Sequence, residues 1–184
     1  MDNLSIVSQK TKLATTVKIG RFCIIEDNVE LCENVVIGDY SLISEGSKIG
    51  ANTKVGTYAK IGKNVSIGAG CSFTSYCEIR DNCVLGDRVK MGSRCTLSAG
   101  TIVEEDVNIK YSFVATDTAD LSKNDIKSIV TLKKGSMYGA NVTIMPGLTI
   151  GSMAEIGACS QVRHDVPDYE IWYGSPAKYF KTRQ

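Results

Sequence analysis

The chain has 184 residues, a length that suits a single domain, and its formal net charge is +1. This near-neutral balance excludes a general electrostatic attraction to nucleic acid or to an anionic membrane surface. No apolar run reaches the length of a membrane span, and the first ten residues lack the basic and apolar regions of a secretory signal. We therefore expect a cytoplasmic protein with no nucleic-acid partner and no membrane partner.

Every sixth residue from Val7 to Ile109 is apolar, without exception. Helices and ordinary sheets have no six-residue period, whereas the hexapeptide is the repeat of a parallel β-helix. The residue two places earlier, such as Cys71 or Val89, is small or β-branched, and alternate residues of a strand face the same way. Asn or Gly commonly stands three places later, where a tight corner needs a left-handed backbone. Each hexapeptide thus predicts one strand and one corner, and three of them predict a triangular turn.

The seven cysteines predict neither disulfides nor a metal site, because their number is odd and no CxxC motif occurs. Five of them occupy the small inward position of the repeat, namely Cys23, Cys71, Cys77, Cys83 and Cys95. We expect these five to be buried as small apolar residues in a reducing compartment.

The six-residue register fails after Ile109 and returns one residue out of step at Leu132. We interpret this as a single domain over 1–184, with a β-helix body at 7–109, a protruding loop at 110–131, the last turns at 132–166 and a tail at 167–184. The tail sequence SPAKYFKTRQ predicts a short helix capped by Ser175, with Pro176 at its first position. The predicted fold is all-β, with about eight triangular turns, one protruding loop and a short C-terminal helix.

Residues 139–180 read GANVTIMPGLTIGSMAEIGACSQVRHDVPDYEIWYGSPAKYF. This segment resembles the C-terminal signature of hexapeptide-repeat acyltransferases, and with the repeats and the loop the resemblance covers nearly the whole chain. The resemblance implies a left-handed parallel β-helix and a homotrimer with sites between its subunits. It also implies acetyl-CoA, or another acyl-CoA, as the co-substrate and no metal. The γ-class carbonic anhydrases share this solenoid, but their zinc needs three histidines and this chain has one.

The resemblance also assigns residues to the acyl-CoA site. The small residues that would line the pantetheine groove are Gly139, Ala140, Gly157 and Ala158. The basic residues that would lie near the phosphates of CoA are Arg163, His164 and Lys178. Each of these three side chains also suits a solvated charge near the end of the chain, and this alternative is stronger for His164 than for Arg163 and Lys178.

Many O-acetyltransferases of this family carry a histidine in the protruding loop, where it deprotonates an acceptor hydroxyl. Here the loop begins VATDT at residues 114–118, and the chain's one histidine, His164, lies in the tail. Asp117 is the best local substitute, although it equally suits an Asx turn. A carboxylate is a poor base for a sugar hydroxyl but can accept a proton from an amine. The chain therefore resembles most the nucleotide-sugar N-acetyltransferases that lack the loop histidine.

An eighteen-residue column places Asp81 and Ala99 below Asp117, and so predicts Arg80 and Asn82 as acceptor-binding residues. Arg80 would hold a phosphate of a nucleotide sugar and Asn82 a sugar hydroxyl, although Asn82 equally suits a corner. The sequence thus favours transfer of an acetyl or other short acyl group from acyl-CoA to the amino group of a nucleotide-linked amino sugar. The alternatives are an O-acetyltransferase acting on a sugar or small-molecule hydroxyl, and a non-catalytic β-helix scaffold.

Overall fold

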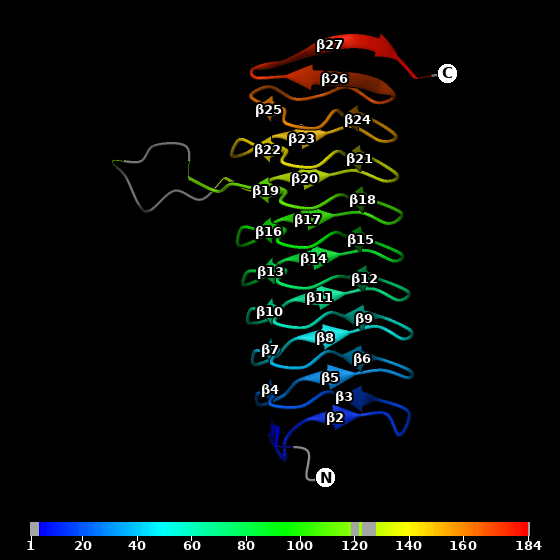
Figure 1. Cartoon of the computed structure of the whole chain (residues 1–184), viewed down its shortest axis with the longest axis vertical. Helices are drawn as coiled ribbons and strands as arrows, with labels where there is room; N and C mark the ends of the chain where they lie inside the picture. The colour runs from blue at the N-terminus through cyan, green and yellow to red at the C-terminus, as the bar shows by residue number, and fades with distance from the viewer. Residues whose placement is uncertain (1–3, 119–121, 123–127, 184) are drawn as a thin grey trace.

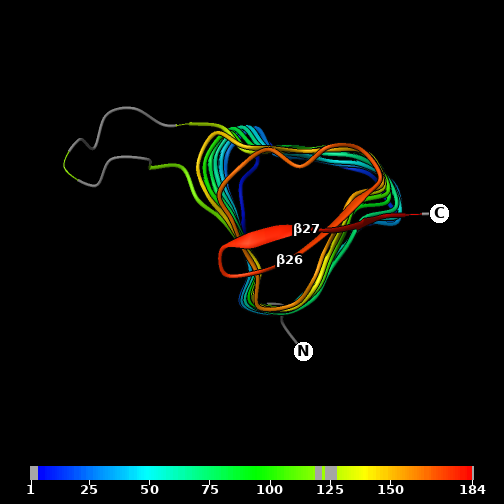
Figure 2. The same cartoon turned by 90° about the horizontal axis from the view of Figure 1, so that it is seen from above.

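The computed structural model describes residues 4–118, 122 and 128–183. These residues wind into a left-handed parallel β-helix, and its triangular cross-section is visible in the end-on view of Figure 2. Each strand of the coil pairs with the strand one turn later, so that Ile61, for example, lies beside Ile43 and Ile79. Figure 1 shows the turns stacked along one long axis. The described residues contain no helix.

The described strands form three sheets, one on each face of the triangle. Sheet A contains β1 (Ile6–Val7), β4 (Ile24–Ile25), β7 (Leu42–Ile43), β10 (Lys60–Ile61), β13 (Glu78–Ile79), β16 (Thr96–Leu97), β19 (Val114–Ala115), β22 (Thr143–Ile144) and β25 (Gln161–Val162). Sheet B contains β2 (Lys12–Leu13), β5 (Glu30–Leu31), β8 (Lys48–Ile49), β11 (Ser66–Ile67), β14 (Val84–Leu85), β17 (Ile102–Val103), β20 (Thr131–Leu132) and β23 (Thr149–Ile150). Sheet C contains β3 (Lys18–Ile19), β6 (Val36–Ile37), β9 (Lys54–Val55), β12 (Ser72–Phe73), β15 (Lys90–Met91), β18 (Asn108–Ile109), β21 (Met137–Tyr138), β24 (Glu155–Ile156), β26 (Glu170–Gly174) and β27 (Ala177–Thr182).

The core is a single column of apolar side chains inside the triangle. Ile61, at the hexad position, is 0% exposed, whereas its strand neighbour Lys60 faces solvent. The corners adopt the expected left-handed backbone, as Asn64 does with a φ of 53°. The predicted alternation of inward and outward side chains is therefore confirmed in the middle of the coil.

One row of corners carries aromatic residues where Asn or Gly is usual. Phe22, Tyr40, Tyr58 and Tyr76 all have positive φ, and their rings stack with centroids 4.8 to 5.0 Å apart. The spacing of the rings equals the spacing of stacked strands, so each turn adds one ring to the stack. We infer that ring stacking offsets the strain of the left-handed backbone at these four corners.

The coil extends one strand further than the sequence predicted before the chain leaves it. β19 pairs with β16 below it and β22 above it, so Val114 and Ala115 belong to sheet A. Here the sizes of the inward residues are exchanged: Phe113 takes the small position and Ala115 the large one, and both are 0% exposed. The exchange conserves core volume while hiding the hexad pattern. The chain rejoins the coil at β20, and the middle of the predicted loop, residues 119–121 and 123–127, lies outside the described residues.

The predicted C-terminal helix is wrong. β26 pairs with β24 and continues sheet C, and β27 returns antiparallel beside β26, with Ser175 and Pro176 in the turn between them. The backbone groups of β26 and β27 thereby find partners that a short isolated helix would leave unpaired. Figure 2 shows this hairpin crossing the end of the triangle, where Trp172 packs against the core and Ala177 is buried.

The five cysteines predicted to point inward are buried, and Cys32 and Cys159 are exposed. Burial raises the pKa of the Cys83 thiol to about 11, and burial also raises the pKa of Cys71. A protonated, enclosed thiol is a poor nucleophile.

We therefore expect iodoacetamide at pH 8 to label Cys32 in the native protein and none of the five buried cysteines, as read by peptide mass spectrometry. Denaturation should expose all five, and native labelling of Cys83 as fast as Cys32 would contradict the core.

Candidate functional site

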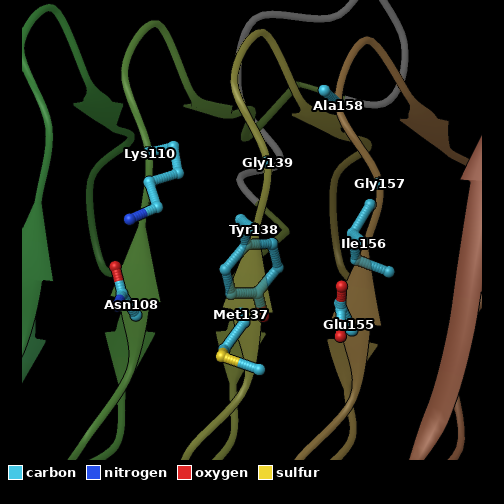
Figure 3. Close-up of a pocket in the computed structure, with 9 residues that line it drawn as sticks. All are labelled: Asn108, Lys110, Met137, Tyr138, Gly139, Glu155, Ile156, Gly157 and Ala158. Carbon is cyan, nitrogen blue, oxygen red and sulfur yellow. The ribbon is translucent and has the colours of Figure 1, made fainter. Parts of the chain in front are cut away.

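A groove of about 280 Å³ runs over three adjacent strands near the C-terminal end of sheet C. Figure 3 shows β18, β21 and β24 side by side with the residues that line it. The lining residues are Asn108, Lys110, Met137, Tyr138, Gly139, Glu155, Ile156, Gly157 and Ala158. Its lining combines apolar side chains and glycines with a few polar groups, namely Asn108, Lys110 and Glu155, as is usual for a ligand site.

Three of these residues occupy the outward position of successive strands. Asn108, Met137 and Glu155 each precede an inward hexad residue, and β18, β21 and β24 align them in register. The sequence analysis missed these three residues. The eighteen-residue spacing of Met137 and Glu155 was a usable signal, because outward residues on stacked turns lie side by side. No such signal existed for Asn108, because the loop insertion separates it from Met137 in the chain.

The glycines of the groove are required by the stacking of the coil. A Cβ on Gly139 would lie 2.5 Å from the backbone nitrogen of Ala158, and a Cβ on Gly157 would lie 2.7 Å from Cβ of Tyr173. Lys110 occupies the equivalent place one turn below Gly139, and its side chain rises at one side of the groove. Gly139 and Gly157 have no side chains. This absence lets the turns of the coil stack closely, and it also leaves the surface hollow where the groove lies.

The four small residues predicted for the pantetheine groove lie together. Gly139 and Ala140 follow β21, Gly157 and Ala158 follow β24, and both corners lead from sheet C to sheet A. We call this row of corners the C/A edge. Lys178 lies on β27 opposite Tyr173 of β26, beyond the C-terminal side of the same groove.

The remaining predicted residues lie on a different edge. Arg80 and Asn82 follow β13, and Asp117 follows β19, at corners that lead from sheet A to sheet B. Arg163 and His164 follow β25, and Val166 pairs with Ile150 of sheet B, so they belong to the same row. We call this row the A/B edge. Sheet A separates it from the C/A edge, so one copy of the chain does not bring the two sets of residues together.

Two residues of the A/B edge have defined local roles. Arg80 lines a small hollow of about 160 Å³ with Asp81 and Ala99, as the eighteen-residue column predicted for that edge. Asn82 has a φ of 61°, which is the backbone that its corner needs.

Asp117 lies where the chain leaves the coil and is half-buried. Its carboxylate accepts a hydrogen bond from the Thr118 hydroxyl at 3.1 Å. Its backbone carbonyl accepts one from the Ser128 N–H at 2.9 Å, which joins the two ends of the excursion. The backbone of Asp117 is therefore held both by its connection to β19 and by the hydrogen bond from Ser128, which fixes the base of its side chain next to the coil.

The ionisable groups of the groove differ in their access to a ligand. Burial raises the pKa of Tyr138, whose hydroxyl is enclosed with that of Ser136 at 2.9 Å. The Tyr138 hydroxyl therefore stays protonated and cannot contact a ligand in the groove. Tyr138 contributes to the groove lining only through its place on β21. Glu155 and Lys110 are the accessible charged groups. In the described residues, no cluster of three or more His, Cys, Asp or Glu side chains is arranged to hold a metal.

A family model described as the GMPPB C-terminal domain matches residues 6–118, which is more than half of the chain. The dTDP-3-amino-3,6-dideoxy-alpha-D-galactopyranose 3-N-acetyltransferase of Aneurinibacillus thermoaerophilus is 49% identical over 47 residues, 26% of this chain and 24% of that enzyme. A probable macrolide acetyltransferase of Lysinibacillus sphaericus is 51% identical over 45 residues, 24% of this chain and 25% of that protein. The matched stretches thus span about a quarter of the length of these relatives.

A solved UDP-N-acetylglucosamine acyltransferase is similar in fold, with a TM-score of 0.62 and 21% identity over 97% of this chain and 72% of that one. In the described part of the chain, no helix is long and apolar enough to cross a membrane. The repeat, the coil and the C-terminal signature agree with the sequence comparisons. The chain belongs to the GMPPB C-terminal domain family and to the hexapeptide-repeat acyltransferase superfamily.

Proposed function

We propose that this protein transfers an acetyl or other short acyl group from acyl-CoA to the amino group of a nucleotide-linked amino sugar. The groove on the C/A edge carries the proposal, since it joins Gly139, Gly157 and Ala158 in a narrow channel of the kind that a pantetheine arm fills. The similarity to a dTDP-amino-sugar N-acetyltransferase supports the choice of acceptor.

In this reaction the main task of the protein is to position the amine next to the thioester. A neutral amine is already nucleophilic, so it attacks the thioester carbonyl once the two are held together, and the thiol of CoA leaves. Backbone N–H groups along the groove would stabilise the oxyanion that forms at that carbonyl. Asp117 would accept the proton that the amine loses, or orient the amine.

We propose further that the working enzyme is a homotrimer. The predicted residues lie on two edges that sheet A separates within one copy. A rotation about an axis parallel to the coil brings the A/B edge of one copy to the C/A edge of the next, and such head-to-tail contacts close into a ring. Asp117 and Arg80 of one copy would then face the groove of its neighbour.

The alternative acceptor is a hydroxyl group. The similarity to a probable macrolide acetyltransferase favours this alternative. A hydroxyl needs a stronger base than an amine does, so the two chemistries respond differently to loss of Asp117.

Release of free thiol from acetyl-CoA should separate these acceptors. We expect turnover with dTDP- or UDP-linked amino sugars and none with the corresponding hydroxy sugars, in a preparation whose native mass corresponds to three copies. Turnover with hydroxyl acceptors alone would reject N-acylation. No turnover, together with no binding of acetyl-CoA by calorimetry, would favour a non-catalytic scaffold.

Asp117→Asn should lower kcat with the amino sugar by about tenfold or less. A general base in proteins contributes about 10²- to 10⁴-fold, whereas an amine requires only a proton acceptor that solvent can replace. Steady-state kinetics with a fixed amino-sugar acceptor measures the effect. A loss of a thousandfold would identify Asp117 as a true base and support the hydroxyl alternative.

Ala158→Trp should raise the KM for acetyl-CoA by about tenfold or more, because the indole fills the groove beside Gly157. Ala51→Trp is the matched control, since Ala51 lies at a corner between sheets B and C, far from the groove lining. Both variants should keep the wild-type melting temperature within a few degrees. An unchanged KM in Ala158→Trp would show that acyl-CoA binds elsewhere.

A further inference from the structure

A second hollow, of about 560 Å³, continues the groove toward the N-terminal end of sheet C. It lies over β12, β15 and β18 and shares Asn108 and Lys110 with the groove, so the two are contiguous. The polar side chains that line it include Thr74, Lys90, Ser93, Asn108, Lys110 and Tyr111. The sequence singled out none of these residues.

Two lysines in this hollow, Lys90 and Lys110, form no ion pair with any described residue. Elsewhere Lys60 pairs with Glu78 at 3.6 Å and Lys134 with Glu105 at 3.0 Å. Among the ion pairs of the described residues, none includes Lys90 or Lys110. Figure 3 shows the Lys110 side chain bending away from β21, to the side of β18 where the hollow lies. The Asp106 carboxylate lies close enough to Lys90 for the two charges to interact, but it is ion-paired with Arg88 at 2.7 Å. Two ammonium groups in one hollow, neither of them in an ion pair of its own, favour an anionic ligand.

The rest of the hollow suits a sugar and a flat ring. Thr74 and Ser93 present hydroxyls that lie 3.0 Å apart, and Asn108 presents an amide. Tyr111 is 59% exposed as a residue, and the described part of the chain offers its ring no stacking partner, unlike Tyr58 and Tyr76, which stack on each other. Hydroxyls and an amide can bind sugar hydroxyls, and a free ring can stack on a sugar or a base.

We propose that this hollow is the acceptor subsite, and that Lys90 and Lys110 bind the phosphate groups of a nucleoside-diphosphate sugar. The proposal rests on the acyl transfer proposed above and names the groups that select its acceptor. CoA also carries phosphates, but the cations that the family resemblance assigns to them, Arg163, His164 and Lys178, all lie toward the C-terminal end of the coil. A CoA whose phosphates lay near Lys178, beyond the C-terminal side of the groove, would extend along the groove toward the hollow. Acceptor and thioester then meet on sheet C, without Arg80 and Asn82 of the same copy.

Steady-state kinetics with dTDP-3-amino-3,6-dideoxygalactose and acetyl-CoA tests the assignment. Lys90 decides it, because Lys90 lines the hollow and not the groove. Lys90→Ala should raise the KM for the nucleotide sugar by about tenfold or more, as expected for loss of a charge-assisted phosphate contact, and leave the KM for acetyl-CoA within about twofold. Lys54→Ala is the matched control, since Lys54 lies on the same face two turns below Lys90 and outside the hollow.

Tyr111 provides a second variant pair. Tyr111→Ala should raise the same KM by about fivefold or more, while Tyr111→Phe, which keeps the ring, should restore it to near the wild-type value. Equal effects of both substitutions would contradict stacking of the ring on the acceptor.

Calorimetric titration with dTDP separates failure of this proposal from failure of the acyl transfer. Wild-type protein should bind dTDP, and Lys90→Ala/Lys110→Ala should bind it at least about tenfold more weakly than Lys54→Ala does. This result would support the subsite even if no acceptor were turned over. Normal turnover with an unchanged nucleotide-sugar KM in Lys90→Ala would overturn the subsite and leave the acyl transfer intact. A rise confined to the KM for acetyl-CoA, or no binding of dTDP by the wild type, would also overturn it.

Discussion

The pairing of each strand with the strand one turn away is the constraint on which the rest of this molecule depends. Backbone hydrogen bonds such as that from the Lys60 N–H to the Cys77 carbonyl, at 2.9 Å, hold the turns together along the whole coil. They require the strands of successive turns to stay in register and every inward pair to fill the same space. The alternation of one large and one small inward residue follows from that requirement. The exchange at Phe113 and Ala115 obeys it as well, since only the total volume of the pair must be kept.

A core this narrow leaves no interior space for a ligand, so chemistry has to take place on the outside. The faces of the triangle are flat, and the corners are where the backbone comes close to solvent. Glycines that stacking requires, such as Gly139 and Gly157, therefore also make the surface hollow at that edge. The same packing rule thus produces the coil and the groove. The alignment of turns adds a second property, because outward side chains from distant parts of the sequence form straight rows.

Those rows give the surface its chemical character. Where lysine and glutamate alternate from turn to turn, as at Lys12, Glu30 and Lys48, the charges are neutralised in ion pairs. Exposed pairs of this kind contribute little to stability, but they remove the attraction for a ligand. In the row that holds Lys90, the residues next to it are uncharged, with Ser72 below it and Asn108 above it. The difference between a neutral face and an anion-binding face therefore comes from which residues lie eighteen positions away.

The sequence by itself determined the hexapeptide coil, its three-sided turns and the inward cysteines. A residue such as Cys83, two places before an inward apolar residue of the repeat, must face the same side of the strand and therefore the core. The family resemblance of the sequence also assigned Gly139, Ala140, Gly157 and Ala158 to one groove, and the structure places the two pairs one turn apart on the same edge. Only the tertiary structure decided the rest of the candidate site. The excursion after β19 has no fixed length in the repeat, so counting along the chain could not align Asn108 and Lys110 with Met137 and Gly139. The tail became a hairpin rather than a helix because the open edge of β24 offered backbone partners to β26, and local preference at Ser175 and Pro176 carried no information about that edge.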